Sequence, residues 1–232
     1  MQDLPWVLPH NVTTGFTCLD TSFYSPVKNS REDAIKKARG GGASAGAAEG
    51  EHAVYAFNRR IMSLAGCALQ ESTSTIGGVP NLPDGPRVVL GARFRPTIGV
   101  GVSRLIGKSA IKLSPASSLH IDGDVKVESL DLDGALYVYA PPGVEMVIRN
   151  LSVKNKGCVR RELTLEELAV EGGAEEVSRL RGYVYEEVEA QELRAVAPYG
   201  QVVVDGNATG TPSDEERFEW KMRGGVEAMS IS

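Results

Sequence analysis

The sequence predicts an α/β fold in which a helical N-terminal region is followed by an all-β region. An amphipathic segment at residues 52–69 has apolar residues at three-to-four-residue spacing. From residue 87 to about 155 the pattern changes to apolar pairs two residues apart, which is typical of short strands. Between them, residues 71–86 are rich in turn-forming residues and end in Asn-Leu-Pro-Asp-Gly-Pro.

These changes of pattern predict three parts. We place a first unit at residues 1–78, a β-helix-like domain at residues 87–205 and a tail at residues 206–232, about which the sequence indicates little. With 232 residues, 42% of them hydrophobic, the chain is long enough for one large or two smaller cores.

The N-terminal elements are predicted from residues 15–51. The segment GFTCLDTSFYSPVKN favours a strand that Pro26 ends, and NSREDAIKKARGGG favours a helix with Asn29 or Ser30 as its N-cap. Lys28 lies directly before that helix. The Gly/Ala-rich residues 39–51 are predicted to be a mobile loop.

The helix predicted at residues 52–69 is expected to pack on the sheet that carries Lys28. Its apolar stripe comprises Val54, Phe57, Ile61, Leu64, Ala65 and Ala68.

The all-β region is predicted from seven apolar pairs separated by Gly, Asp, Ser or Asn. They are Ile111/Leu113, Leu119/Ile121, Val125/Val127, Leu130/Leu132, Leu136/Val138, Met146/Ile148 and Leu151/Val153. The pairs start every five to ten residues, which favours the rungs of a parallel β-helix over the alternative, an antiparallel meander. Further on, Thr164 and Glu167 form a capping box, and RLRGYVYEEVEA and YGQVVVDG read as two more strands.

Composition excludes several classes of function. A net charge of -5 and a pI near 5.4 argue against nucleic acid as a partner. No run approaches the ~20 apolar residues needed to cross a bilayer, and the start of the chain lacks a signal peptide, so we expect a cytoplasmic protein that does not bind membranes. The three cysteines are too far apart for a metal knuckle and are expected to be buried thiols.

Other polar residues offer weaker candidates for chemistry. His10, His52 and His120 have no metal-binding or triad spacing, and Asp122, Asp124, Asp131 and Asp133 are expected to be solvated corners between strands. No metal ligand is therefore assigned. The Gly-Val-Gly at residues 99–101 is expected to form a turn, and Tyr183 and Tyr185 are expected to be packing residues.

Four segments in one order carry a resemblance to a known family. GFTCLDTSFYSPVKNSREDA, AVYAFNRRIMSLAG, SLDLDGALYV and RLRGYVYEEVE together resemble the C-terminal part of UDP-sugar pyrophosphorylases, also called UTP-monosaccharide-1-phosphate uridylyltransferases. The resemblance spans residues 1 to about 192. It implies the C-terminal part of a Rossmann-like nucleotidyltransferase domain followed by a β-helix-like domain.

The resemblance also implies a reaction: UTP and a sugar 1-phosphate give a UDP-sugar and pyrophosphate, with Mg²⁺. In the Pro-Val-Lys-Asn stretch the matching catalytic and substrate-binding position is Lys28, which would contact the substrate phosphates, and Asn29 would have a lesser phosphate-side or capping role. A cation ~4 Å from a phosphate charge is worth about 4 kcal/mol at an effective dielectric of 20. Without the resemblance, Lys28 would read as a solvated turn lysine.

The family's glycine-rich loop, G-G-x-G-x-R-x-G, and its magnesium ligands belong to an N-terminal half that has no counterpart in these residues. We therefore expect a fragment that is inactive alone and whose partner is the N-terminal half of the same enzyme. Two alternatives stay open: a UDP-N-acetylhexosamine or UDP-glucose pyrophosphorylase fragment, and a non-catalytic β-helix interaction module.

Overall fold

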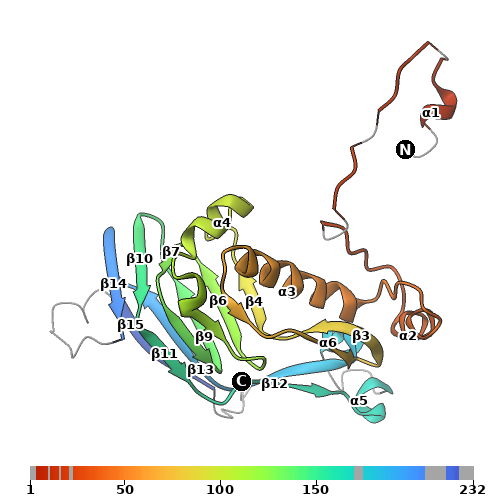
Figure 1. Ribbon diagram of the computed structural model, residues 1–232. Helices are drawn as coiled ribbons and strands as arrows, with labels where there is room; N and C mark the ends of the chain where they lie inside the picture. The colour runs from red at the N-terminus through yellow and green to blue at the C-terminus, as the bar shows by residue number, and fades with distance from the viewer. Residues whose placement is uncertain are drawn as a thin grey trace.

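The computed structural model describes residues 4–9, 11–15, 17–20, 23–169, 175–206 and 218–224. Figure 1 shows a body of short strands with a long helix across it, and an N-terminal segment that extends away from the body. The chain is mixed α/β, as predicted.

The helices form close to where capping signals place them. They are α1 (Leu4–Val7), α2 (Arg31–Arg39), α3 (Ala47–Leu64), α4 (Ile98–Arg104), α5 (Leu165–Ala169) and α6 (Glu176–Arg181), with a 3-10 turn at Lys108–Ala110. Ser30 is the N-cap of α2, since its hydroxyl accepts a hydrogen bond from the Asp33 N–H at 3.2 Å. The predicted capping box before α5 is confirmed: the Thr164 N–H donates to Glu167 at 2.8 Å, and the Glu167 N–H donates to the Thr164 hydroxyl at 3.2 Å.

The strands form three sheets with parallel pairing and one hairpin. The first sheet contains β1 (Ala68–Leu69), β5 (Ile111–Leu113), β8 (Leu130–Asp133) and β11 (Leu151–Lys154). The second contains β7 (Asp124–Val127), β10 (Val144–Arg149) and β14 (Gly200–Asp205). The third contains β4 (Arg87–Leu90), β6 (Ser118–Asp122), β9 (Ala135–Tyr139) and β13 (Tyr183–Ala195), with β12 (Gly157–Glu162) and β15 (Phe218–Arg223) antiparallel to β13. The hairpin joins β2 (Ser72–Ile76) to β3 (Val79–Asp84).

Successive strands between β5 and β11 enter different sheets, and apolar residues stack in register within each sheet. In the first sheet Ile111 pairs with Leu130, which pairs with Leu151, and all three side chains are buried. All seven predicted pairs occupy buried strand positions. The ladders that join these strands are parallel, so the antiparallel meander is excluded.

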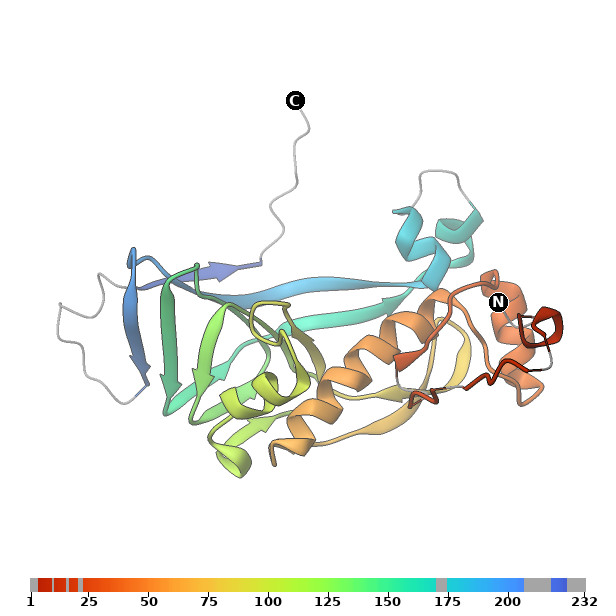
Figure 2. The ribbon, with the colours of Figure 1, turned by 90° about the horizontal axis from the view of Figure 1, so that it is seen from above.

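Strand β13 links the stacked strands to the hairpin end of the molecule. Figure 2 shows this long strand running from α6 across the body, with β12 beside it. Its C-terminal half pairs in parallel with β9 through Gln191–Arg194. The predicted strands within residues 179–190 and 199–206 are thus confirmed as β13 and β14, whereas Arg179–Arg181 belong to α6.

Two hydrophobic clusters hold α3 in place. Ile61 and Met62 join the large core made by the stacked strands, whereas Ala48 joins a small core with Ala34 of α2 and Tyr183 of β13. The turn-rich residues 71–86 form the β2–β3 hairpin, against which α3 packs.

Two predictions for the N-terminal region are wrong. The described residues between 15 and 24 form no strand, and Lys28 lies in a loop. Pro26 has no N–H to donate to a neighbouring strand, and several residues around it are polar, so the segment pairs with no strand. Residues 39–51 are not a loop throughout: α3 begins at Ala47, since alanine favours helix and Gly46 and Gly50 let neighbouring segments approach closely. A Cβ at Gly46 would lie 2.6 Å from the Ala34 Cβ, and one at Gly50 would lie 2.5 Å from Val27.

The buried face of α3 also differs from the predicted stripe. Val54 and Leu64 are exposed, whereas His52, Asn58 and Arg59 are buried beside Ile61 and Met62. Each buried polar residue has a partner: Asn58 donates to the Val88 carbonyl at 3.0 Å, and Arg59 pairs with Glu71. These contacts offset part of the cost of burial, while Asn58 Oδ1 and Arg59 Nη2 make no hydrogen bond within the described residues. Apolar periodicity does not indicate buried polar side chains.

Three smaller expectations are corrected. Residues 99–101 lie inside α4 instead of a turn, because Thr97 caps the helix by accepting from the Val100 N–H at 3.2 Å. Cys18 is exposed, and Cys67 and Cys158 are partly buried free thiols. Among the described residues no helix has the length and apolar character that a membrane crossing requires.

Candidate functional site

Lys28 lies at the tip of a loop whose backbone is fixed by α3. The N–H groups of Lys28 and Asn29 both donate to the Ala45 carbonyl, at 2.9 and 3.1 Å. Glu49, in the first turn of α3, in turn accepts from the Ala45 N–H and the Ser44 hydroxyl, each at 2.5 Å. The loop therefore has a defined conformation although its side chains face solvent.

Asn29 holds the loop together. Its amide nitrogen donates to the Ser44 carbonyl at 2.6 Å, and its amide oxygen accepts from Lys37 at 2.8 Å. Both polar atoms of the side chain are thus engaged within the chain. Since Ser30 is the N-cap, Asn29 contributes to the site by fixing the backbone that presents Lys28.

The Lys28 side chain is exposed and makes no hydrogen bond or ion pair with another described residue. Lys37 on α2, which donates to Asn29, adds positive charge nearby in an otherwise acidic chain. Glu32 and Asp33 occupy the first turn of α2 and already balance its dipole, so the side-chain cations, not the helix terminus, are what an anion would meet.

A cavity of about 310 Å³ lies between the segment before Lys28 and α3. Tyr24 and Ser25 line one side of it, and Glu49, Phe57 and Arg60 line the other. Phe23 packs edge-to-face on Phe57, with ring centroids 5.4 Å apart, and Arg60 pairs with Asp20 at 3.2 Å. Arg60 was not predicted from the sequence, although its position about one turn before the end of an amphipathic helix, next to Arg59, was a possible signal.

A buried polar network fixes the other side of α3. Glu51 accepts hydrogen bonds from Tyr55 at 2.5 Å and Tyr183 at 2.9 Å and pairs with Arg181 at 3.0 Å. Burial alone would raise the pKa of Glu51, but these hydrogen bonds and the charge of Arg181 together lower it. The same burial and contact with Glu51 raise the pKa of Tyr183. The network keeps a carboxylate ionised and rigid.

The two histidines that the structure describes take no part in the Lys28 loop. His52 is buried, with Nδ1 3.1 Å from the Pro83 carbonyl and Nε2 3.4 Å from the Tyr185 hydroxyl, and burial lowers its pKa. His120 lies on β6 between Tyr137 and Tyr139, and its pKa is also lowered by burial. His10 lies outside the described residues. The two described histidines therefore serve packing, as do Tyr183 and Tyr185.

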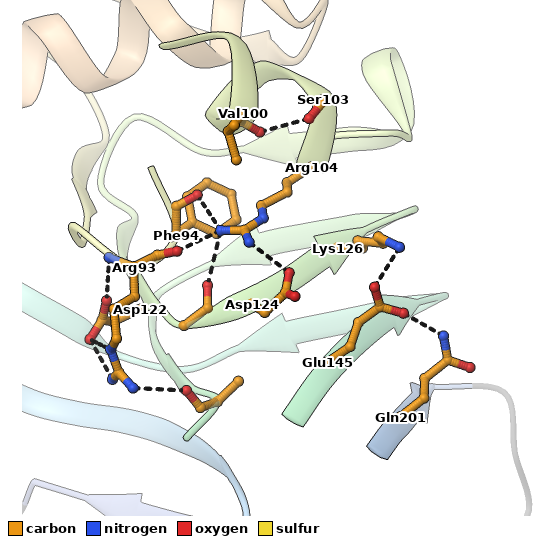
Figure 3. Close-up of polar contacts among 12 residues, drawn as sticks. Arg93, Phe94, Val100, Ser103, Arg104, Asp122, Asp124, Lys126, Glu145 and Gln201 are labelled. Carbon is orange, nitrogen blue, oxygen red and sulfur yellow. Dashed lines mark hydrogen bonds and ion pairs between the residues drawn. The ribbon is translucent and has the colours of Figure 1, made fainter. Parts of the chain in front are cut away.

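The aspartates predicted to be solvated corners are partly engaged in ion pairs. Figure 3 shows the ion pairs of Arg93 with Asp122 and of Arg104 with Asp124, whose nitrogen–oxygen distances are 2.6 and 2.8 Å. Arg104 also donates to the carbonyls of Arg93 and Phe94, each at 2.6 Å, so it ties α4 to the strands. Asp133 accepts from the Ser114 hydroxyl at 2.7 Å, and Asp131 is exposed. In the part of the chain that the structure describes, no group of three or more His, Cys, Asp or Glu side chains is placed to hold a metal ion.

Comparison with known proteins identifies relatives for most of the chain. UDP-sugar pyrophosphorylase of Arabidopsis thaliana is 32% identical over 204 residues, which are 85% of this chain and 31% of the relative. UDP-sugar pyrophosphorylases of Oryza sativa, subspecies indica and japonica, are each 29% identical over 195 residues, 83% of this chain and 30% of the relatives. No protein-family model matches the chain.

The chain is thus a homologue of part of these UDP-sugar pyrophosphorylases, and the resemblance predicted from its sequence is confirmed. It spans about 30% of their length.

Proposed function

We propose that this chain is the C-terminal portion of a uridylyltransferase that makes UDP-sugars and pyrophosphate from UTP and sugar 1-phosphates. The observation that carries the proposal is homology over 85% of the chain to a protein named UDP-sugar pyrophosphorylase, combined with a cation at the tip of a fixed loop. The glycine-rich loop and the Mg²⁺ ligands would come from polypeptide that corresponds to the rest of the relatives' length, so this chain alone would be inactive.

In this proposal Lys28 binds the substrate phosphates. Attack of the sugar phosphate oxygen on the α-phosphorus of UTP places negative charge on oxygens that already repel the incoming anion. An ammonium group held beside them stabilises that charge more in the transition state than in the ground state. Lys28 suits this role because its backbone is fixed by Ala45 while its ammonium has no competing partner among the described residues.

The cavity beside α3 supports the same placement. Its walls include Tyr24 and Ser25, so it offers an aromatic face and a hydroxyl next to the loop that carries Lys28. Mg²⁺ held by the remainder of the enzyme would neutralise further phosphate charge.

We also propose that the three parallel sheets form a β-helix-like domain beginning near residue 87. The support is that every third strand from β5 to β11 returns to the same sheet in register. This domain would give the catalytic part a rigid base, because α3 is packed on it through Ile61 and Met62.

A chimeric enzyme tests the proposed function. This chain would replace the aligned segment of the Arabidopsis protein, and pyrophosphate release from UTP and a panel of sugar 1-phosphates would be measured. We expect turnover in the chimera and, in its Lys28→Ala variant, a kcat lower by at least about a hundredfold, the usual effect of removing one group that stabilises transition-state charge. The isolated chain should show no turnover.

The matched control is Lys36→Ala, which removes an exposed lysine of α2 that has no described partner. It should leave kcat unchanged. A folded chimera without turnover would contradict the uridylyltransferase assignment and favour the interaction module, whereas equal kcat values for the parent and Lys28→Ala chimeras would remove the role of Lys28. Turnover with only glucose 1-phosphate, or only an N-acetylhexosamine 1-phosphate, would favour a UDP-glucose or a UDP-N-acetylhexosamine pyrophosphorylase instead.

A further inference from the structure

A second cavity, of about 410 Å³, lies beside the start of β4 and has a different chemical lining from the cavity near Lys28. Its lining includes three cationic residues, Arg87, Lys156 and Arg160, and two acidic residues, Asp84 and Asp133. Ser118, Cys158 and Tyr185 also line it. These residues come from β3, β4, β6, β8, β12 and β13 and the residue before β12, so rigid strands hold most of the lining.

Arg87 is half-buried at this cavity and has no carboxylate partner. Its guanidinium lies over the Tyr185 ring, 4.4 Å from the centroid, and its Nη2 donates to the Cys158 Sγ at 3.3 Å. Burial alone would lower the pKa of Arg87, but the neighbouring Cys158 and tyrosine side chains raise it. Among the described residues no ion pair engages it. Removing part of a cation from water without an opposite charge nearby is unfavourable, and a bound anion would offset that cost.

Arg160, which lines the same cavity, differs from Arg87 in having a carboxylate partner. Arg160 makes a two-pronged contact with Asp84, at 3.2 and 3.1 Å, so its charge is compensated within the chain. Lys156 is exposed at the rim, and no described residue pairs with its ammonium group. Arg87 and Lys156 therefore have no carboxylate partner among the described residues. Asp133 also lines the cavity, where its carboxylate accepts from the Ser114 hydroxyl, so the three cations and two carboxylates leave the lining with a net positive charge.

We propose that this cavity binds a small phosphorylated metabolite, with Arg87 and Lys156 on the phosphoryl oxygens and the Ser118 hydroxyl and Tyr185 ring beside the rest of the molecule. A phosphoryl dianion matches two cations, and guanidinium and ammonium groups are the usual donors to it. The volume exceeds what one phosphate group fills, and hydroxyl and aromatic groups suit a sugar. This inference does not depend on the proposed function, because it involves neither Lys28 nor α2.

Binding would be measured by isothermal titration of the full 232-residue chain with inorganic phosphate, glucose 1-phosphate and glucose, against sodium chloride of equal ionic strength. We expect both phosphates to bind and glucose alone not to bind. Tighter binding of glucose 1-phosphate than of phosphate would identify the metabolite as a sugar phosphate, and equal binding would identify the phosphoryl group as the whole determinant. The Lys28→Ala variant should bind as the parent chain does, which separates this site from the proposed catalytic one.

The decisive variant is Arg87→Gln, which should weaken binding of phosphate at least about tenfold, the effect of losing one charge-assisted hydrogen bond. Its matched control is Arg194→Gln, because Arg194 also stacks on a tyrosine, 4.8 Å from the Tyr139 centroid, but pairs with Glu192. Unchanged affinity in a folded Arg87→Gln chain, or no binding of either phosphate beyond the chloride control, would overturn the proposal.

A measurement on the unmutated chain avoids any dependence on how the variants fold. Because Cys158 lies in the cavity against Arg87, glucose 1-phosphate should slow its alkylation by iodoacetamide by at least about tenfold. Exposed Cys18 serves as the reference within the same molecule. Equal alkylation of Cys158 with and without glucose 1-phosphate at saturating concentration would contradict binding at this cavity.

Discussion

At the residue scale, some side chains around the Lys28 loop are held by hydrogen bonds within the chain, whereas the Lys28 side chain is exposed. Asn29, Glu49 and Glu51 are each engaged by two or more groups, and each fixes a part of the backbone around α3. Among the described residues, Lys28 is engaged only through its backbone N–H. A loop held on one side with a free cation on the other suits an anion that binds from outside the described residues.

The pairing of Asp84 with Arg160 makes a prediction for acid stability. Burial alone would raise the pKa of Asp84, but hydrogen bonds from Arg160, Ser74 and the Gly85 N–H lower it from 3.8 to about 2. A carboxyl group whose pKa is lower in the folded state stabilises the fold above its unfolded pKa, and this contribution is lost as the pH falls from about 4 to 2. We expect Asp84→Asn to lower the free energy of unfolding by roughly 2 kcal/mol at pH 7 and to flatten its decline between pH 4 and 2.

Urea denaturation at a series of pH values checks this. Asp131→Asn, at an exposed position of β8, is the control and should keep the slope of the parent chain. An Asp84→Asn chain with the parent's stability at pH 7 and the parent's slope in acid would show that the ion pair contributes nothing.

At the scale of elements, the close contact between α2 and α3 positions the Lys28 loop. Gly46, the N-cap of α3, has ordinary dihedral angles, φ -102° and ψ 172°, so its conformation does not require glycine. Space requires it, because an added Cβ would lie 2.6 Å from the Ala34 Cβ, and Ala34 is buried. We expect Gly46→Ala to destabilise the chain by about 1–3 kcal/mol through overpacking.

Gly99→Ala is the matched control. Gly99 lies in α4 with open space around its Cα, so alanine should leave stability unchanged or raise it by about 0.5–1 kcal/mol through helix propensity. Guanidinium unfolding of both variants measures the difference. Equal stability of the Gly46→Ala and parent chains would mean that α2 can move away from α3 at no cost.

The helices and strands also show which features of the fold can be predicted from the sequence. The two-residue spacing of Leu130/Leu132 and its counterparts predicted the strands correctly, because strand faces alternate at every residue. The start of α3 was missed because residues 39–51 are rich in small side chains, which in a sequence indicate a loop. In the folded chain the same small side chains let α3 pack closely against neighbouring segments. His52 and Arg59 were missed as buried residues because their partners lie outside α3: Tyr185 is on β13, and Glu71 is in the connection between β1 and β2.

At the scale of the whole molecule, the stacked strands give α3 a rigid support, and α3 in turn fixes the Lys28 loop through Ala45 and Glu49. The role of Lys28 was predicted from a resemblance to a family and not from its own surroundings, which show only an exposed cation. The cavity at Arg87 was not predicted, because β4, β12 and β13 meet there only in the folded chain.

We propose that the Lys28 ammonium lies against the substrate phosphates in the assembled enzyme. In the chimera, an amine-reactive reagent would be applied with and without UTP, Mg²⁺ and sugar 1-phosphate, and labelling of each lysine would be read by peptide mass spectrometry. We predict that the substrates protect Lys28 at least about tenfold and leave Lys36 unprotected. Equal labelling of Lys28 in the presence and absence of substrates, in a chimera that turns over, would contradict the claim.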